Sequence, residues 1–217
     1  MTPEPPTPMA LDRSGPAQLA DAGYALVPAA VACATLQLDL AGLDALRQSW
    51  ERLPRDAYLR DGGNYRARRH SCFVQTPAAG LLEAVPHRPH WQPTSYNALH
   101  GGLTRWFIEA HQFRIDTASG IGRPTPEGAH RDGVDFVAVI LVGRRNVLGG
   151  ETRVFEARGA SGVRFTMQEP WSMLLMDDAR VIHETTPIQP QGKDGVRDTL
   201  VLTYRAGGFQ APEAPPA

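Results

Sequence analysis

The chain has 217 residues, of which 42% are hydrophobic and 21% are charged, and its net charge is −1. This length predicts a single domain with enough residues to bury a sizeable core. The near-neutral charge gives no general attraction to nucleic acid or to anionic membranes, and no apolar run is long enough to span a bilayer. The proline-rich N-terminus lacks the pattern of a secretory signal. We therefore expect a cytoplasmic protein with one domain at residues 13–208, between disordered tails at residues 1–12 and 209–217.

The beginning of the chain is expected to supply helices that support a sheet. Residues 17–22 predict a short helix that ends at Gly23, and residues 24–27 predict a brief strand. Apolar side chains then recur three or four apart over residues 36–53. This spacing predicts one amphipathic helix that ends at Pro54.

The middle of the chain is expected to alternate between strand and helix. Residues 61–64 have the composition of a turn, and residues 65–75 alternate well enough to predict a strand. Residues 103–115 carry apolar side chains at helical spacing, which predicts a second supporting helix. A loop that contains proline and glycine follows at residues 120–128.

The second half of the chain has the pattern of antiparallel β structure. Short β-rich segments are separated by Gly, Pro and Asp. They cover residues 134–142, 151–155, 163–167, 172–176, 181–188 and 199–204. Helices followed by such strands predict an α+β chain with a small jelly-roll-like double sheet.

A candidate metal-binding pattern lies at the start of this β-rich half. His130 and Asp132 are two residues apart, so on extended backbone both side chains would point to the same face. His183 follows in a separate predicted strand, after a polar turn at residues 177–180. Two imidazoles and one carboxylate that leave coordination positions open are typical of non-haem Fe(II) oxygenases. Because an H-x-D pair alone is common by chance, the prediction depends on all three residues together.

A candidate carboxylate anchor lies in the last predicted strand. Arg197 follows His183 by fourteen positions, and Thr199 is two further on, hence on the same face. An arginine fork with a neighbouring hydroxyl suits the distal carboxylate of a 2-oxoacid. The alternative is an ordinary surface salt bridge between Arg197 and Asp194 or Asp198.

The residues that would bind a substrate are less defined. Arg66 and Arg68 alternate on a predicted strand, so they share a face, and either would suit a substrate carboxylate. A solvated basic edge that discourages strand pairing is an equally open alternative. Tyr96 and Asn97 lie in a loop that would contribute to a pocket.

Several motifs together resemble one family. They lie at residues 61–69, 130–136, 145–146, 149–152, 177–183 and 197–198. Between roughly residues 60 and 205, the chain resembles the 2-oxoglutarate/Fe(II) dioxygenases related to bacterial L-isoleucine dioxygenase. The resemblance implies a double-stranded β-helix fold. It also implies Fe(II) at His130, Asp132 and His183, and 2-oxoglutarate at Arg197, with Thr199 completing an Arg-x-Thr pattern.

The resemblance implies an enzyme that uses Fe(II), 2-oxoglutarate and O₂ to hydroxylate a small-molecule substrate, with release of succinate and CO₂. A free L-amino acid is the expected substrate, and a peptide or a natural-product intermediate is the main rival. A cupin-like Zn or Ni isomerase or hydrolase, which would not need Arg197, is one alternative. A catalytically silent metal-binding module is another. The sequence leaves a homodimer open and predicts no nucleic-acid or membrane partner.

Overall fold

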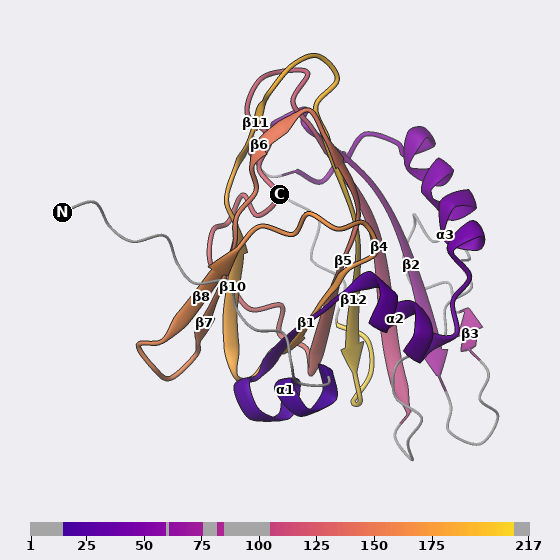
Figure 1. Cartoon of the computed structure of the whole chain (residues 1–217), viewed down its shortest axis with the longest axis vertical. Helices are drawn as coiled ribbons and strands as arrows, with labels where there is room; N and C mark the ends of the chain where they lie inside the picture. Colours follow the sequence, from indigo (N-terminus) through magenta and orange to yellow (C-terminus); the bar gives the residue numbers. More distant parts are fainter. Residues whose placement is uncertain (1–14, 60, 76–81, 85–104, 211–217) are drawn as a thin grey trace.

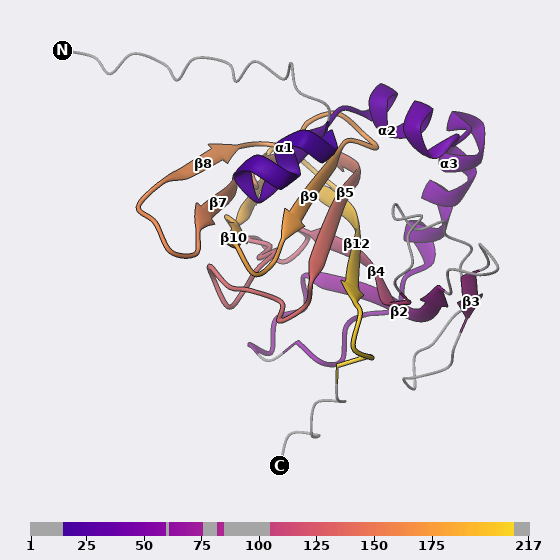
Figure 2. The same ribbon diagram turned by 90° about the horizontal axis from the view of Figure 1, so that it is seen from below.

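The computed structural model describes residues 15–59, 61–75, 82–84 and 105–210. The predicted tail at residues 1–12, residues 211–217 of the other predicted tail, Tyr96 and Asn97 lie outside these residues. Most of the described chain forms two antiparallel sheets that face each other, with the helices outside the larger one (Figure 1). This is a jelly-roll double-stranded β-helix, as the sequence predicts. Figure 2 shows the same layers from below.

The larger sheet has seven strands, and every neighbouring pair in it is antiparallel. In spatial order they are β1 (Tyr24–Val27), β9 (Met173–Asp177), β5 (Phe136–Arg145), β12 (Val196–Arg205), β4 (Trp106–Asp116), β2 (Arg66–Gln75) and β3 (Leu82–Ala84). Strands far apart in the sequence are therefore neighbours, which brings the last strand, β12, to the centre of the sheet.

The facing sheet is smaller. It contains β10 (Val181–Thr185), β7 (Thr152–Glu156) and β8 (Gly162–Phe165) in that order. A further pair, β6 (Val147–Gly149) with β11 (Ile188–Pro190), closes one end of the two sheets. The predicted strand at residues 181–188 is thus two strands, since the chain leaves the sheet at Thr186 and Pro187.

The long helix predicted over residues 36–53 is wrong, because the chain breaks there into three pieces. These are α2 (Ala29–Leu36), α3 (Leu40–Arg47) and the 3₁₀ helix η1 (Gln48–Arg52), after an initial helix α1 (Gly15–Ala22). Gln37 is left-handed, with φ 53°, and ends α2. The Asp39 carboxylate then accepts hydrogen bonds from Ala41 N and Gly42 N, which caps a new helix. The apolar spacing continues across this break because all three pieces cover the same sheet.

The helix predicted over residues 103–115 is also wrong, because the chain forms strand β4 from Trp106 to Asp116. It pairs with β12 along one side and with β2 along the other. Both faces of such a central strand are covered, so buried side chains do not follow a strict alternation. The resulting apolar pattern resembles helical spacing, and partners distant in the sequence decide the structure.

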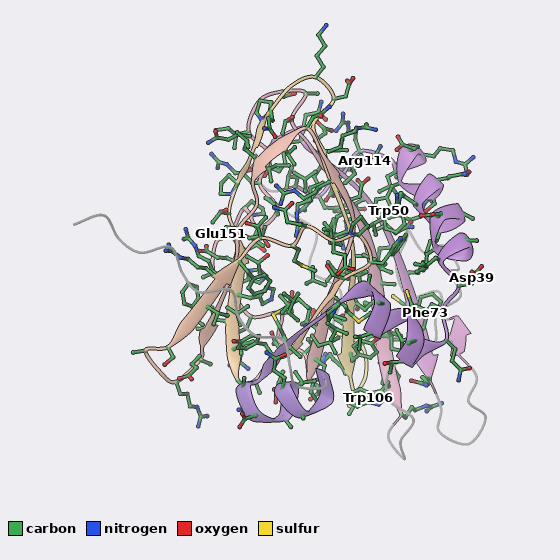
Figure 3. All side chains as sticks on the ribbon, in the orientation of Figure 1. Asp39, Trp50, Phe73, Trp106, Arg114 and Glu151 are labelled. Atoms are coloured by element: carbon green, nitrogen blue, oxygen red, sulfur yellow. The ribbon has the colours of Figure 1, made fainter. Side chains whose placement is uncertain are left out.

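Alternate side chains of the larger sheet enter two separate cores. On the outer face they pack with the helices, and Trp50, Phe73 and Trp106 in Figure 3 belong to this layer. On the inner face, Val137 and Leu141 pack with residues of the smaller sheet. The inner face therefore borders the space between the sheets, where the candidate site lies.

In the described part of the chain, no single helix is long and apolar enough to cross a membrane. Helices Ala29–Leu36 and Leu40–Arg52 reach the required length and hydropathy only when they are taken together, and this pair is bent by 109°.

Candidate metal centre

The three predicted metal ligands converge in space although they come from distant segments. The His183 Nε2 atom lies 3.0 Å from Asp132 Oδ2, and His130 Nε2 lies 3.8 Å from Asp132 Oδ1. One ligand atom from each residue can be chosen so that all lie within 4.8 Å of one another. Metal–ligand distances near 2.1 Å place neighbouring ligands of one ion roughly 3 Å apart. The donor set therefore fits a single first-row metal ion.

The backbone holds the two histidines in this arrangement. His130 N donates to His183 O at 3.0 Å, and His183 N donates to His130 O at 2.9 Å. His183 lies within β10, and His130 joins it as an isolated bridge. The two imidazole rings lie 4.6 Å apart and are tilted by 49°.

One contact of His130 fixes which of its nitrogens can bind a metal. Its Nδ1 atom lies 2.9 Å from the carbonyl oxygen of Gly128. A carbonyl only accepts hydrogen bonds, so Nδ1 carries the proton and Nε2 keeps its lone pair. This is the usual second contact of a metal-binding histidine.

The Asp132 carboxylate is negatively charged at neutral pH. Burial is the strongest influence on its pKa and raises it, but the hydrogen bond from His183 and the charges of His183 and His130 outweigh burial. The pKa consequently lies below its ordinary value. An ionised carboxylate is the form that binds a divalent cation.

The segment around Asp132 is not the extended strand that the H-x-D spacing suggested. Only His130 makes a strand-like bridge, and Gly133 is left-handed with φ 74°. Instead, the fully buried Asp178 carboxylate accepts hydrogen bonds from the backbone N–H groups of Asp132, Gly133 and Val134, at 3.0, 2.8 and 3.1 Å. Asp178 lies in the turn between β9 and β10, and β10 carries His183. It therefore links the Asp132 turn to the strand of the second histidine.

The predicted carboxylate anchor, Arg197, lies inside the molecule. It is 3% exposed, and within the described residues its guanidinium takes part in no hydrogen bond or ion pair. Burial, followed by the charge of Arg144, lowers the pKa of Arg197 to about 10, and Asp198 opposes this. The surface salt bridge considered above is wrong, because Asp194 is exposed and Asp198 binds Arg114 at 2.7 Å. A buried cation of this kind is ready to receive an anion.

Neighbouring residues shape the space around Arg197. Thr199 is 3% exposed and lies two residues further along β12, on the same face. Arg144 is opposite Arg197 in the β5–β12 register, and its guanidinium donates to three backbone carbonyl oxygens. A Cβ atom on Gly150 would lie 3.7 Å from Arg197 Cδ and 2.9 Å from Ile188 Cγ2. Gly150 therefore allows the backbone to pass close to the arginine.

Arg66 and Arg68 lie on the inner face of β2, which is an interior strand. Arg66 Nε donates to Asp56 Oδ2 at 2.6 Å, and Arg68 Nη2 donates to His111 Nδ1 at 3.1 Å. Both guanidinium groups lie over the Phe113 ring, at 5.3 and 5.5 Å. The solvated basic edge considered for these residues does not fit this packing.

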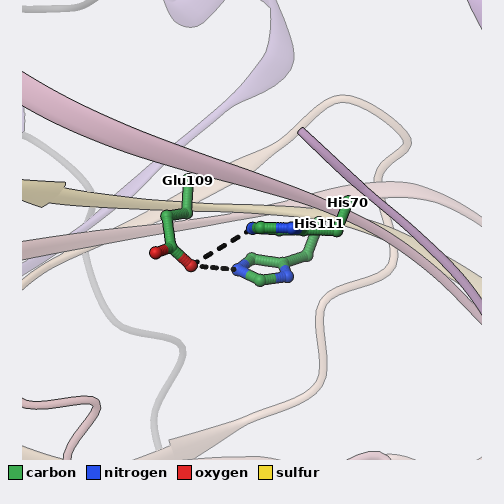
Figure 4. A group of neighbouring side chains, drawn as sticks. All are labelled: His70, Glu109 and His111. Atoms are coloured by element: carbon green, nitrogen blue, oxygen red, sulfur yellow. Dashed lines mark hydrogen bonds and ion pairs between the residues drawn. The ribbon is translucent and has the colours of Figure 1, made fainter. Parts of the chain in front are cut away.

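A second cluster of ligand-type residues was missed in the sequence. His70 of β2 and Glu109 and His111 of β4 lie side by side, as Figure 4 shows. The sequence does contain a signal, since Glu109 and His111 are two apart and share a face of a strand. The incorrect helix over residues 103–115 concealed it, because helical geometry points these two side chains in different directions.

Comparisons with known proteins agree with this geometry. A family model described as 2OG-Fe dioxygenase matches residues 47–109 and 104–203. The crystal structure of a bsmA homologue from Methylobium petroleophilum PM1 is 49% identical, with a TM-score of 0.82 over 91% of this chain and 94% of that one. No curated protein matches the chain.

More distant solved structures share the fold. IDO from Bacillus thuringiensis is 16% identical, with a TM-score of 0.70 over 93% of this chain and 97% of that one. An oxidoreductase of the 2OG-Fe(II) oxygenase family from Burkholderia pseudomallei is 19% identical, with a TM-score of 0.57 over 90% and 91% of the two chains.

Proposed function

Since the chain belongs to the 2OG-Fe dioxygenase family, we propose that it hydroxylates a small molecule, and that this substrate is a free L-amino acid. Enzymes of this family use Fe(II), 2-oxoglutarate and O₂. When bound, these groups supply the oxidation that inserts one oxygen atom into a C–H bond and releases succinate and CO₂.

The observation that carries the proposal is the combination of the metal-type cluster with a buried arginine on the inner face that has no ion-pair partner among the described residues. In the proposed site, His130, Asp132 and His183 hold Fe(II), because two neutral nitrogens and one carboxylate suit this ion and leave positions open. Arg197 binds the distal carboxylate of 2-oxoglutarate, and Thr199 adds a hydroxyl contact. A zinc or nickel isomerase or hydrolase would leave the buried charge of Arg197 without a role.

The protein's own part in the reaction is to bind, orient and exclude water. Asp178 fixes the turn that carries Asp132, and the His130–His183 bridge fixes both imidazoles. Arg197 and Thr199 orient the 2-oxoacid from the central strand β12. No protein group has to act as a general base, because iron held by His130, Asp132 and His183 would supply the oxidising chemistry.

A free amino acid is supported by two features. The motifs at residues 61–69 and 130–136 resemble dioxygenases related to L-isoleucine dioxygenase. In addition, Arg68 lies on the inner face of the larger sheet, in the same cross-strand row as Phe113 and Thr199. An arginine there suits the α-carboxylate of an amino acid.

The test is a succinate assay with Fe(II), ascorbate and 2-oxoglutarate over the twenty proteinogenic L-amino acids. We expect at least one amino acid to stimulate succinate release and to gain the mass of one oxygen atom. If none is modified while another small molecule is, the substrate class is wrong. Turnover supported by zinc without O₂ would contradict the proposed role of the metal site itself.

A further inference from the structure

The cluster of His70, Glu109 and His111 has the composition of a second metal site. The His70 Nε2 atom lies 3.2 Å from Glu109 Oε2, and His111 Nε2 lies 3.6 Å from the same oxygen (Figure 4). His70 and Glu109 are 3% and 7% exposed. Composition and spacing therefore do not separate this cluster from the one formed by His130, Asp132 and His183.

The orientation of the rings does separate the two clusters. The lone pair of an imidazole nitrogen lies in the ring plane, so an ion shared by two histidines must lie near both planes. The rings of His70 and His111 are stacked, with centroids 4.4 Å apart and an angle of 28° between their planes. Their lone pairs are therefore nearly parallel and do not point to one common position. The 49° tilt between His130 and His183 allows their planes to converge.

The contact of His111 with Arg68 also opposes metal binding at the His111 Nε2 atom. Arg68 Nη2 lies 3.1 Å from His111 Nδ1, and arginine can only donate. Nδ1 therefore holds the lone pair, and in the neutral ring Nε2 carries the proton, which points to Glu109. Burial above all lowers the pKa of His111, to about 3, so the ring is neutral. The guanidinium of Arg68 would also repel a dication at this position.

We propose that His70, Glu109 and His111 form a metal-free polar chain that positions Arg68 for an anionic group of the substrate. The chain runs from Arg68 to His111, from His111 to Glu109, and from His70 to the same Glu109 carboxylate. The role of Arg68 rests on the proposed function, whereas the protonation of the chain does not.

The position of Arg68 supports this role. In the sheet register, Arg68 is opposite Phe113 and Phe113 is opposite Thr199, so the three residues form one row on the inner face. The Phe113 ring lies 5.5 Å from the guanidinium carbon and stacks on His111 at 5.7 Å. His111 uses one of the five N–H donors of the arginine, and both contacts restrict its orientation.

The first experiment counts metal ions and needs no substrate. The full-length protein is reconstituted with zinc, dialysed and measured by elemental analysis, beside an Asp132→Ala variant. We expect one equivalent in the wild type and none in the variant. Two equivalents in the wild type would overturn the proposal, as would one equivalent in Asp132→Ala that is lost when Glu109→Gln is added. Two equivalents in the wild type would overturn the proposal even if the variant folds poorly.

The second experiment measures the protonation of the chain. Long-range ¹⁵N–¹H NMR on the zinc-loaded wild type should show a neutral ring protonated at Nε2 for His111 and a proton on Nε2 of His70, with assignments from His70→Gln and His111→Gln. A zinc-bound or Nδ1-protonated His111 would contradict the chain.

The third experiment tests the role of Arg68 with the amino acid that the succinate assay identifies. Arg68→Lys should raise KM for this amino acid about tenfold or more, because it loses a fork-shaped charged contact. KM for 2-oxoglutarate should stay unchanged. Glu109→Gln should shift KM in the same direction, since it loosens the chain that holds the arginine. The matched control is Arg69→Lys, on the opposite face of the same strand.

An unchanged KM in Arg68→Lys would overturn the role of Arg68. So would a natural substrate without an anionic group. If no amino acid is turned over, the proposed substrate class and the role of Arg68 are both wrong. The metal count and the histidine protonation still test whether His70, Glu109 and His111 form a metal-free chain.

Discussion

His130 and His183 donate a backbone hydrogen bond to each other in both directions, at 3.0 and 2.9 Å, although 53 positions separate them in the sequence. This reciprocal bridge places both imidazoles next to the Asp132 carboxylate before any ligand binds. Iron binding then requires little rearrangement of the backbone, which lowers the entropic cost of forming the site.

Asp132→Ala should abolish iron binding and turnover. The substitution removes the only charged ligand of the proposed site and leaves two neutral imidazoles. Iron content after anaerobic reconstitution and succinate release measure the effect. Circular dichroism should show an intact fold, and a variant that retains iron at the wild-type level would contradict the ligand assignment.

Arg197→Ala should chiefly raise the concentration of 2-oxoglutarate that the enzyme requires, by at least about tenfold, because charged hydrogen bonds to a carboxylate are lost. Iron content should remain unchanged. The control is Arg145→Ala, which removes an exposed arginine of β5. Equal requirements in Arg197→Ala and the wild type would show that the anchor lies elsewhere.

Asp178→Asn should weaken both the fold and the metal site. The wild-type carboxylate accepts three backbone N–H groups, and an amide would direct its own donors towards them. We expect a loss of about 2–4 kcal/mol in the free energy of unfolding, together with lower iron affinity. The neighbouring Asp177→Asn, whose side chain accepts only from Ala179 N among the described residues, should change both quantities little.

His111 should make the protein sensitive to acid. Its folded pKa of about 3 lies below the ordinary histidine value, so the unfolded chain binds the proton more readily. Stability contributed by the neutral ring is thus present above about pH 6.5 and is lost as the pH falls towards 3.

Denaturant unfolding between pH 7 and 4 measures this effect, by comparing the wild type with His111→Gln. As the pH falls, the free energy of unfolding of the wild type should decrease by up to about 1.4 kcal/mol more per pH unit than that of the variant. Parallel pH profiles would show that the ring is not held neutral.

The sequence predicted the strands of the second half and the pair His130 with Asp132 because both depend on local signals. Alternating side chains reveal strands such as β5, and the H-x-D spacing reveals His130 with Asp132. The sequence did not predict β4, because a strand covered on both faces lacks alternation. It also did not predict the helix start at Asp39, because the capping role of this residue depends on where the chain turns. It missed Asp178 as the support of the turn, because that contact joins segments about 45 residues apart.

The domain limits, the cytoplasmic location, the homodimer and the role of Asn97 stay predictions from the sequence.

Trp50, in η1 on the outer face of the larger sheet, is 1% exposed, and its indole N–H is shared between Phe113 O at 3.1 Å and Thr199 O at 3.3 Å. The second oxygen belongs to the residue whose side chain lies beside Arg197 on the opposite face. Trp50 is thus a natural fluorophore that is hydrogen-bonded to the backbone of β12, the strand that carries Arg197. Quenching or a spectral shift that disappears in Trp50→Phe would report 2-oxoglutarate binding optically, without a label and without turnover.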